Sequence, residues 1–229
     1  MNFLLEGLLT AGMLIATFDP EVYHIAWLTL HISLGATVLA AAAGIPMAVL
    51  LVEGDFWGKD SLITLVNTLM ALPTVVVGLS VFLFLSRQGP LGGWELLFTP
   101  TAIVIGQFIL AIPIVVALTI AALSGIDPRI RETALTLGAS RSRAALSVIR
   151  EARYAVVAAI IAGFARIIAE VGSALIVGGN IRGYTRTLAT AMALETGKGE
   201  FAFAIALGLI LILLSLITNV SLRVLTHRP

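Results

Sequence analysis

Five long apolar segments dominate this chain of 229 residues and limit what it can fold into. A helix needs roughly 20 mostly apolar residues to cross a bilayer, so each segment predicts one membrane-spanning helix. Charged residues make up only 12% of the chain, against about 25% in a typical soluble domain. We therefore predict an all-α membrane protein, a single domain over residues 1–229, whose five-span core (25–222) has its helices at about 25–52, 62–86, 101–124, 154–178 and 201–222.

A sixth apolar stretch, Phe3–Phe18, precedes this core. It is 16 residues long, contains Glu6 and ends at Asp19-Pro20. Its length and charge favour an interfacial or re-entrant helix within residues 1–19, with a sixth span as the alternative. The first 58 residues contain no Lys or Arg, so we expect no cleaved secretory signal, which needs a positively charged start.

Proline and polar residues interrupt the apolar segments. Pro46, Pro73 and Pro113 lie in the first three and are expected to kink the helices, because proline removes a backbone donor. Polar side chains also lie within the segments and are expected to form hydrogen bonds between helices; they are Asn67, Gln107 and Ser173.

The distribution of Lys and Arg predicts the orientation of the chain. Nine of them lie in the 53–61 loop, the 125–153 loop and the C-terminal end, which five spans place on one side. Four lie on the other side: Arg87, Arg182, Arg186 and Lys198. Since Lys and Arg accumulate in cytoplasmic loops, we expect the N-terminus outside and the C-terminus, with Arg223 and Arg228, in the cytoplasm.

The 125–153 loop, which we call the elbow, has strong helix signals. Asp127-Pro128 is a helix start, Gly138 a stop, and Ser140 a second N-cap. The pattern predicts a helix–turn–helix on the membrane surface whose second helix continues through Arg153 into the fourth span. An Arg-rich segment of this kind can lie on anionic lipid or dock a partner protein. A DNA-binding helix–turn–helix does not fit a short loop held against a bilayer.

The elbow also resembles a known motif. Glu132-Thr133-Ala134 followed by Gly138 is similar to the EAA motif of ABC-importer permeases, with Thr133 in place of the middle Ala. The runs GASRSRAALSVIREAR and GGNIRGYTRTLATAMALETGKGEFAFAIALGLILI resemble molybdate and tungstate permeases, and specifically the tungstate branch. The consensus proline after the motif is absent here, where the matching stretch is Val148–Glu151. The likeness covers most of residues 20–225.

The resemblance implies a fold, partners and roles. The implied fold is a permease bundle of the methionine/molybdate type. The implied assembly is a homodimer with two ATPase subunits and an extracytoplasmic oxyanion-binding protein. The motif would form the helix that docks on the ATPase, and its implied coupling residues are Glu132, Thr133, Ala134, Gly138, Ala139, Ser140 and Arg141.

The chain has no visible energy source of its own. No G-x-x-x-x-G-K-[ST] phosphate loop occurs, and Gly197-Lys198 lacks the earlier glycine of that motif. ATP and Mg are therefore expected on a partner chain, with no catalytic residue and no cofactor here. A metal site is not expected either, because the chain has no cysteine and His24, His31 and His227 lack metal-ligand spacing.

Two groups of residues are candidates for the anion path or its gate. Arg166 and Glu170 lie four residues apart inside the fourth span, on one helix face. They either line the path, with Arg166 attracting an oxyanion, or neutralise each other and hold helices together. The outer loop 179–200 offers donors suited to an oxyanion, and it can instead meet the binding protein or form a gate; these residues are Asn180, Arg182, Thr185, Arg186 and Thr187.

Together these patterns predict a multi-pass permease of the cell membrane that imports tungstate, with no nucleic-acid partner. Molybdate or another oxyanion is the alternative substrate. A stand-alone ion-coupled carrier is the alternative class, but it needs intramembrane acids, and only Glu170 qualifies.

Overall fold

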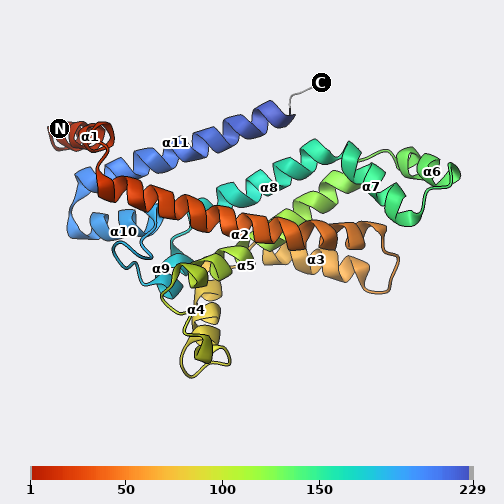
Figure 1. Cartoon of the computed structure of the whole chain (residues 1–229), viewed down its shortest axis with the longest axis horizontal. Helices are drawn as coiled ribbons and strands as arrows, with labels where there is room; N and C mark the ends of the chain where they lie inside the picture. Colours follow the sequence, from red (N-terminus) through yellow and green to blue (C-terminus); the bar gives the residue numbers. More distant parts are fainter. Residues whose placement is uncertain (1, 227–229) are drawn as a thin grey trace.

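The computed structural model describes residues 2–226, except the side chains of residues 2–4, 219, 222, 223, 225 and 226. Within this part of the chain every regular element is a helix (Figure 1). Arg228 and His227 lie outside the described residues, as does the side chain of Arg223. The elements are α1 (Asn2–Ala16), α2 (Pro20–Glu53), α3 (Lys59–Leu69), α4 (Thr74–Leu85), the 3-10 turn η1 (Gly92–Trp94), α5 (Pro100–Ser124), α6 (Pro128–Thr136), α7 (Arg141–Glu151), α8 (Arg153–Ile168), α9 (Gly172–Gly178), α10 (Leu188–Lys198) and α11 (Phe201–Thr226).

Three continuous helices are long and apolar enough to cross a membrane: α2, α5 and α11. The second and fourth predicted spans are each two helices, α3 with α4 bent by 100° and α8 with α9 bent by 62°. Counting each bent pair as one span gives five, as the sequence predicts. The two bent pairs are broken spans or re-entrant loops rather than simple kinked helices.

Only one of the three prolines lies at a break. Pro73 is the N-cap of α4 in an extended conformation, so the chain changes direction there. The helices α2 and α5 continue through Pro46 and Pro113. Neighbouring helices and local adjustments can compensate for the missing donor in a membrane bundle.

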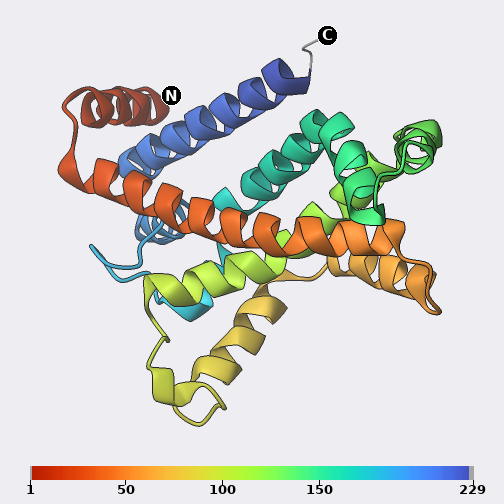
Figure 2. The same cartoon turned by 45° about the vertical axis from the view of Figure 1, so that its right-hand side comes forward.

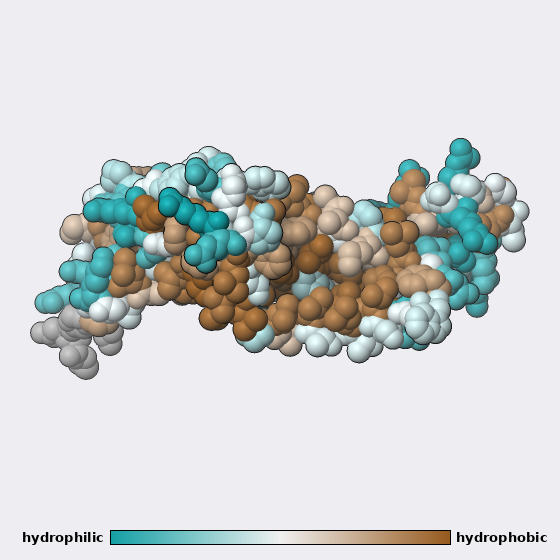
Figure 3. Space-filling view, turned by 90° about the horizontal axis from the view of Figure 1, so that it is seen from below, coloured by the Kyte–Doolittle hydropathy of each residue, from teal (hydrophilic) through white to brown (hydrophobic). Residues whose placement is uncertain are grey.

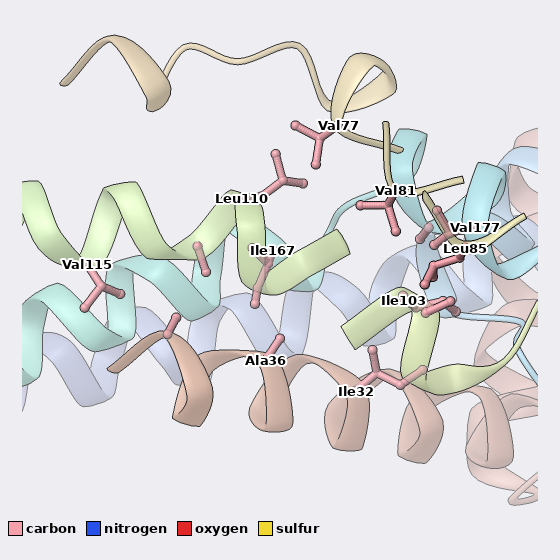
Figure 4. Packing of buried hydrophobic residues seen from close by; sticks show 14 residues of the cluster. Ile32, Ala36, Val77, Val81, Leu85, Ile103, Leu110, Val115, Ile167 and Val177 are labelled. Carbon is pink, nitrogen blue, oxygen red and sulfur yellow. The ribbon is translucent and has the colours of Figure 1, made fainter. Parts of the chain in front are cut away.

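The core lies where α2, α5 and the two broken spans meet. Its side chains come from five elements: α2 (Ile32, Ala36), α4 (Val77, Val81), α5 (Ile103, Leu110, Val115), α8 (Ile167) and α9 (Val177) (Figure 4). Small residues allow close approach between these helices. A Cβ atom at Gly44 of α2 would lie 3.2 Å from Val115 of α5, which leaves no room for a larger residue without movement.

The two broken spans touch each other through glycine. A Cβ atom at Gly78 of α4 would lie 2.7 Å from the backbone Cα of Ser173 in α9. A Cβ atom at Gly172 would lie 2.7 Å from Thr74 Oγ1. Both contacts join the first half of α4 to the start of α9, so the two broken spans pack against each other beside their breaks.

The short helix α1 lies beside α11 rather than within the core. Figure 1 shows α1 almost end-on while α2 and α11 run across the page, so α1 crosses them steeply (Figures 1 and 2). Its link to α2 is fixed by Tyr23, whose hydroxyl donates to the Ile15 carbonyl at 3.1 Å and whose ring stacks on Phe18. This crossing fits a helix that lies along the membrane surface.

The polar residues gather at the two ends of the molecule. Figure 3 shows hydrophilic surfaces at both ends, separated by an apolar band. The elbow and the start of α3 form one end, which we call the elbow end. The start of α2 and the loop after α9 form the other, which we call the loop end. The apolar band is the part expected in contact with lipid.

The close contact at Gly78 generates a stability prediction. We expect Gly78→Ala to lower the free energy of unfolding by about 1–3 kcal/mol, because the new methyl group overlaps the backbone of α9. Gly35→Ala is the control, since Gly35 lies in helix α2 and nothing approaches its Cβ position within 4 Å. Unfolding of the purified protein in detergent measures both. Equal stability of the two variants would contradict the contact.

Candidate functional site

The predicted helix–turn–helix is present in the elbow. The Asp127 carboxylate accepts from the Arg129 backbone N–H at 2.9 Å at the start of α6. Gly138 has φ +84°, the left-handed conformation that favours glycine, and nothing lies within 4 Å of its Cβ position. Ser140 then caps α7 by accepting from the Arg143 N–H at 3.4 Å. The turn is therefore narrow and unobstructed, which suits insertion into a groove.

The elbow leaves its predicted coupling residues open to contact. Helix α6 has no buried residue, whereas α7 buries Ala144 and packs Val148 against Leu123 of α5 and Val156 of α8. Ala134 and Ala139 are half-buried, and the other predicted coupling residues are exposed: Glu132, Thr133, Gly138, Ser140 and Arg141. Figure 1 shows α6 as the part of the elbow farthest from the bundle.

One detail of the elbow prediction is wrong. Helix α7 ends at Glu151 and α8 begins at Arg153, so the second helix does not run unbroken into the fourth span. Arg153 Nη1 donates to the Arg150 carbonyl at 3.1 Å and its guanidinium lies 4.5 Å from the Tyr154 ring. The first contact occupies a carbonyl of the last turn of α7, which favours a break at Ala152.

An ion pair attaches the elbow to α2. Arg131 Nε of α6 lies 2.7 Å from Glu53 Oε2, at the last residue of α2. Both side chains are partly buried beside a groove of about 550 Å³ between the end of α2 and the elbow. Lys59 Nζ donates to the carbonyls of Val52 and Gly54, both at 3.0 Å, and so fixes the end of the same helix.

Arg166 and Glu170 form the ion pair that their spacing predicts. Arg166 Nη1 lies 3.2 Å from Glu170 Oε2, and the side chains are 44% and 4% exposed. Glu170 Oε1 also accepts from the Ser173 N–H at 3.1 Å, so the carboxylate caps the start of α9. The pair therefore lies at the break of the fourth span and belongs to its structure, while half of Arg166 remains accessible.

The break is further supported by Gln107 of α5. Its side-chain amide donates to the Ile167 carbonyl at 3.2 Å, which confirms the predicted bond between helices. The Ser173 hydroxyl has no partner within the described residues, and Asn67 is exposed.

The predicted outer loop is shorter than expected, because residues 188–198 form α10. In the remaining 179–187 loop, three of the predicted side chains bond to the protein itself. Thr185 Oγ1 donates to the Gly178 carbonyl at 2.5 Å, and Asn180 bonds Thr190. Thr187 caps α10 in a capping box with Thr190. These groups order the loop and are not free to bind an anion in this conformation.

The two arginines of the loop pair with carboxylates that sequence reasoning did not single out. Arg182 Nε donates to Glu21 Oε1 at 2.7 Å, and Arg186 lies 3.4 Å from Glu21 and 3.6 Å from Glu195. The hydrogen bond and the charge of Glu21 raise the pKa of Arg182 above its ordinary value. A signal was available for Glu21 and Glu53, because they are the only Asp, Glu, Lys or Arg residues in α2 and lie at its ends.

Within the described residues, no three or more His, Cys, Asp or Glu side chains form a group that could hold a metal ion.

Comparison with known proteins identifies the family. Residues 40–229 match the family of binding-protein-dependent transport system inner membrane components. The chain is 45% identical over 175 residues to a probable anion ABC transporter permease protein of Haloferax volcanii, covering 74% of this chain and 75% of that one. It is 38% identical over 194 residues to the tungstate uptake system permease protein TupB of Peptoclostridium acidaminophilum, covering 85% of each.

A solved structure supports the fold. The inward-facing MetNI methionine ABC transporter has a chain that superimposes with a TM-score of 0.69, covering 92% of this chain and 99% of that one. Sequence identity is 16%, so this likeness concerns the fold alone. It agrees with the methionine/molybdate-type bundle that the sequence implies. Family, relatives and fold agree: the chain is a multi-pass membrane protein and belongs to the family of inner membrane components of binding-protein-dependent transport systems.

Proposed function

We propose that this chain is the membrane-spanning subunit of an ATP-driven importer for tungstate. It passes the oxyanion from an extracytoplasmic binding protein to the cytoplasm. The observation that carries the proposal is the exposed elbow, in which Glu132 and Gly138 of the coupling motif lie on α6 and at its narrow turn. The 38% identity to a tungstate uptake permease over 85% of the chain supports the substrate.

The proposed assembly is a homodimer with two ATPase subunits. The sequence contains no phosphate loop, so ATP and Mg bind the ATPase chains. Helix α4 supports the homodimer because it points away from its own bundle (Figures 1 and 2). Its exposed apolar side chains would pack on a second copy: Val75, Val76, Leu79, Leu83 and Phe84.

The proposed orientation places the elbow and the C-terminus in the cytoplasm and the N-terminus outside. The arginines of the elbow support it, because Lys and Arg accumulate on the cytoplasmic side. The elbow end would then meet the ATPase, and the loop end would meet the binding protein.

The proposed anion path passes Arg166. Its guanidinium has five N–H donors, and within the described residues only Nη1 is bonded, to Glu170. The remaining donors can attract an oxyanion, while Glu170 keeps the interaction weak enough for release. At the loop end, Arg182 and Arg186 are the proposed gate residues, held by Glu21 and Glu195. We propose that the gate also depends on three side chains that order the backbone of the loop: Asn180, Thr185 and Thr187.

The proposed coupling role of the turn can be tested directly. We expect Gly138→Val to abolish uptake and substrate-stimulated ATP hydrolysis while the dimer stays folded, because a side chain at this φ remodels the turn. Gly58→Val is a matched control, since Gly58 also has positive φ and nothing within 4 Å of its Cβ position, but lies outside the elbow. Uptake and ATPase assays in proteoliposomes compare the two variants, and Gly58→Val should keep both activities. Normal coupling in Gly138→Val would refute the assignment of the turn.

Another prediction separates the two roles of the Arg166–Glu170 ion pair. Arg166→Met should lower stability by about 1–3 kcal/mol, because it leaves the buried Glu170 carboxylate without its charged partner, while the 44% exposure of Arg166 lets solvent weaken the pair. Adding Glu170→Gln removes that charge and should recover most of the stability. If Arg166 also attracts the anion, uptake stays low in the double variant. Restored uptake would leave the pair a purely structural role.

The proposed substrate can be tested by competition between oxyanions. Reconstituted with its ATPase and binding protein, the complex should take up labelled tungstate, and unlabelled tungstate should compete better than molybdate. Preference for molybdate would select the alternative oxyanion. Uptake by the permease alone, without an ATPase, would instead favour a stand-alone carrier.

A further inference from the structure

Helix α2 is a single unbroken element that joins the two polar ends of the molecule. It has 34 residues, which at 1.5 Å per residue makes it about 50 Å long. Glu21 in its first turn and Glu53 at its last residue are its only Asp, Glu, Lys or Arg residues. Each of these two carboxylates is paired with arginine from another segment.

At the elbow end, the ion pair between Glu53 and Arg131 attaches α6 directly to the end of α2. Helix α6 has no buried residue, and its apolar side chains Ile130, Ala134 and Leu135 are only half-buried. The pair is direct, at 2.7 Å, and Lys59 fixes the carbonyls on both sides of Glu53. A displacement of α6 therefore acts directly on the end of α2.

At the loop end, α2 holds the 179–187 loop. Glu21 accepts from Arg182 Nε at 2.7 Å and lies 3.4 Å from Arg186, whose side chain is only 10% exposed. The backbone N–H of Leu188 also donates to Thr29 Oγ1 of α2 at 2.8 Å, and both residues are fully buried. The loop is thus attached to α2 by charge and by a buried hydrogen bond.

The covalent route between the same two ends is less rigid. From the elbow it passes through the break at Ala152 and then through residues 169–171, where α8 and α9 are bent by 62°. Breaks of this kind absorb displacement as hinges do. The helix α5 also leaves the elbow unbroken, but its far end follows a different loop, at Thr99.

We propose that α2 is the mechanical link between the two ends, and that Glu53–Arg131 and Glu21–Arg182/Arg186 fasten it. When α6 moves, α2 shifts along α5 and carries the 179–187 loop with it. Glu53, Arg131 and Glu21 are positioning residues in this scheme and contact no substrate. The inference rests on the proposed function, because the ATPase supplies the movement of α6.

The absence of cysteine in the chain makes the link testable by site-directed labelling. Tyr184→Cys places one thiol in the 179–187 loop, where Tyr184 is 49% exposed. The complex with the ATPase and binding protein is reconstituted in liposomes, and the rate of maleimide modification is compared with and without ATP. ATP should change this rate. Glu53→Gln should reduce the ATP-dependent change about fivefold while ATP hydrolysis continues, as expected from loss of one ion pair.

Three further variants test the same pair. Arg131→Gln should reduce the ATP-dependent change as much as Glu53→Gln does. The test therefore still holds if one of the two variants fails to fold. The charge reversal Glu53→Arg with Arg131→Glu should restore the ATP-dependent change. Arg129→Gln should leave it intact, because Arg129 lies two residues away on α6, its side chain is 87% exposed, and within the described residues its guanidinium pairs only with Asp127, at 4.0 Å.

The loop end is tested in the same assay. Glu21→Gln should also reduce the ATP-dependent change, and combining it with Glu53→Gln should add nothing, because both act on one route. A full ATP-dependent change in Glu53→Gln and Arg131→Gln would overturn the link and leave the proposed function intact. Failure of the unaltered chain to bind an ATPase would overturn the proposed function and the link together.

Discussion

The structure depends on one constraint: no water in the apolar band satisfies a free backbone N–H or carbonyl group. Continuous helices meet this constraint within themselves, as α2, α5 and α11 do. The break between α8 and α9 needs other partners, and the protein supplies them from side chains. Gln107 donates to the Ile167 carbonyl and Glu170 accepts from the Ser173 N–H. At this break the irregular backbone thus lies among polar side chains that bond to it.

The same constraint explains how charge is distributed. Ion pairs are concentrated at the two ends, where water is near, and Arg166–Glu170 is the pair placed at a break within a span. An ionisable pair in this position is costly, and its geometry gives it two uses. Glu170 organises the start of α9, while the partly exposed Arg166 has the donors that we propose for an anion. The structural role of the pair therefore belongs to the Glu170 carboxylate, and the proposed transport role to the free donors of Arg166.

Transport of this kind requires parts that move and parts that transmit the movement. The elbow buries nothing on α6 and is held by an ion pair, which suits an element that a partner displaces. The glycine contacts between α4 and α9 let two broken spans share one region without bulky side chains. The unbroken α2 connects this machinery to the 179–187 loop. Rigid and hinged elements are thus combined in one small bundle.

The sequence by itself determined the helical class, the five apolar segments and the elbow, because length, hydropathy and capping residues such as Asp127 and Ser140 are local properties. It also placed Arg166 and Glu170 on one face, since their spacing matches a helical turn. Only the tertiary structure decided that two spans are broken, that Pro73 rather than Pro46 or Pro113 lies at a break, and that Glu53 meets Arg131. Those outcomes depend on which groups from distant segments satisfy the freed backbone and the charges. Glu53 and Arg131 are 78 positions apart, so no local sequence pattern indicates that they pair.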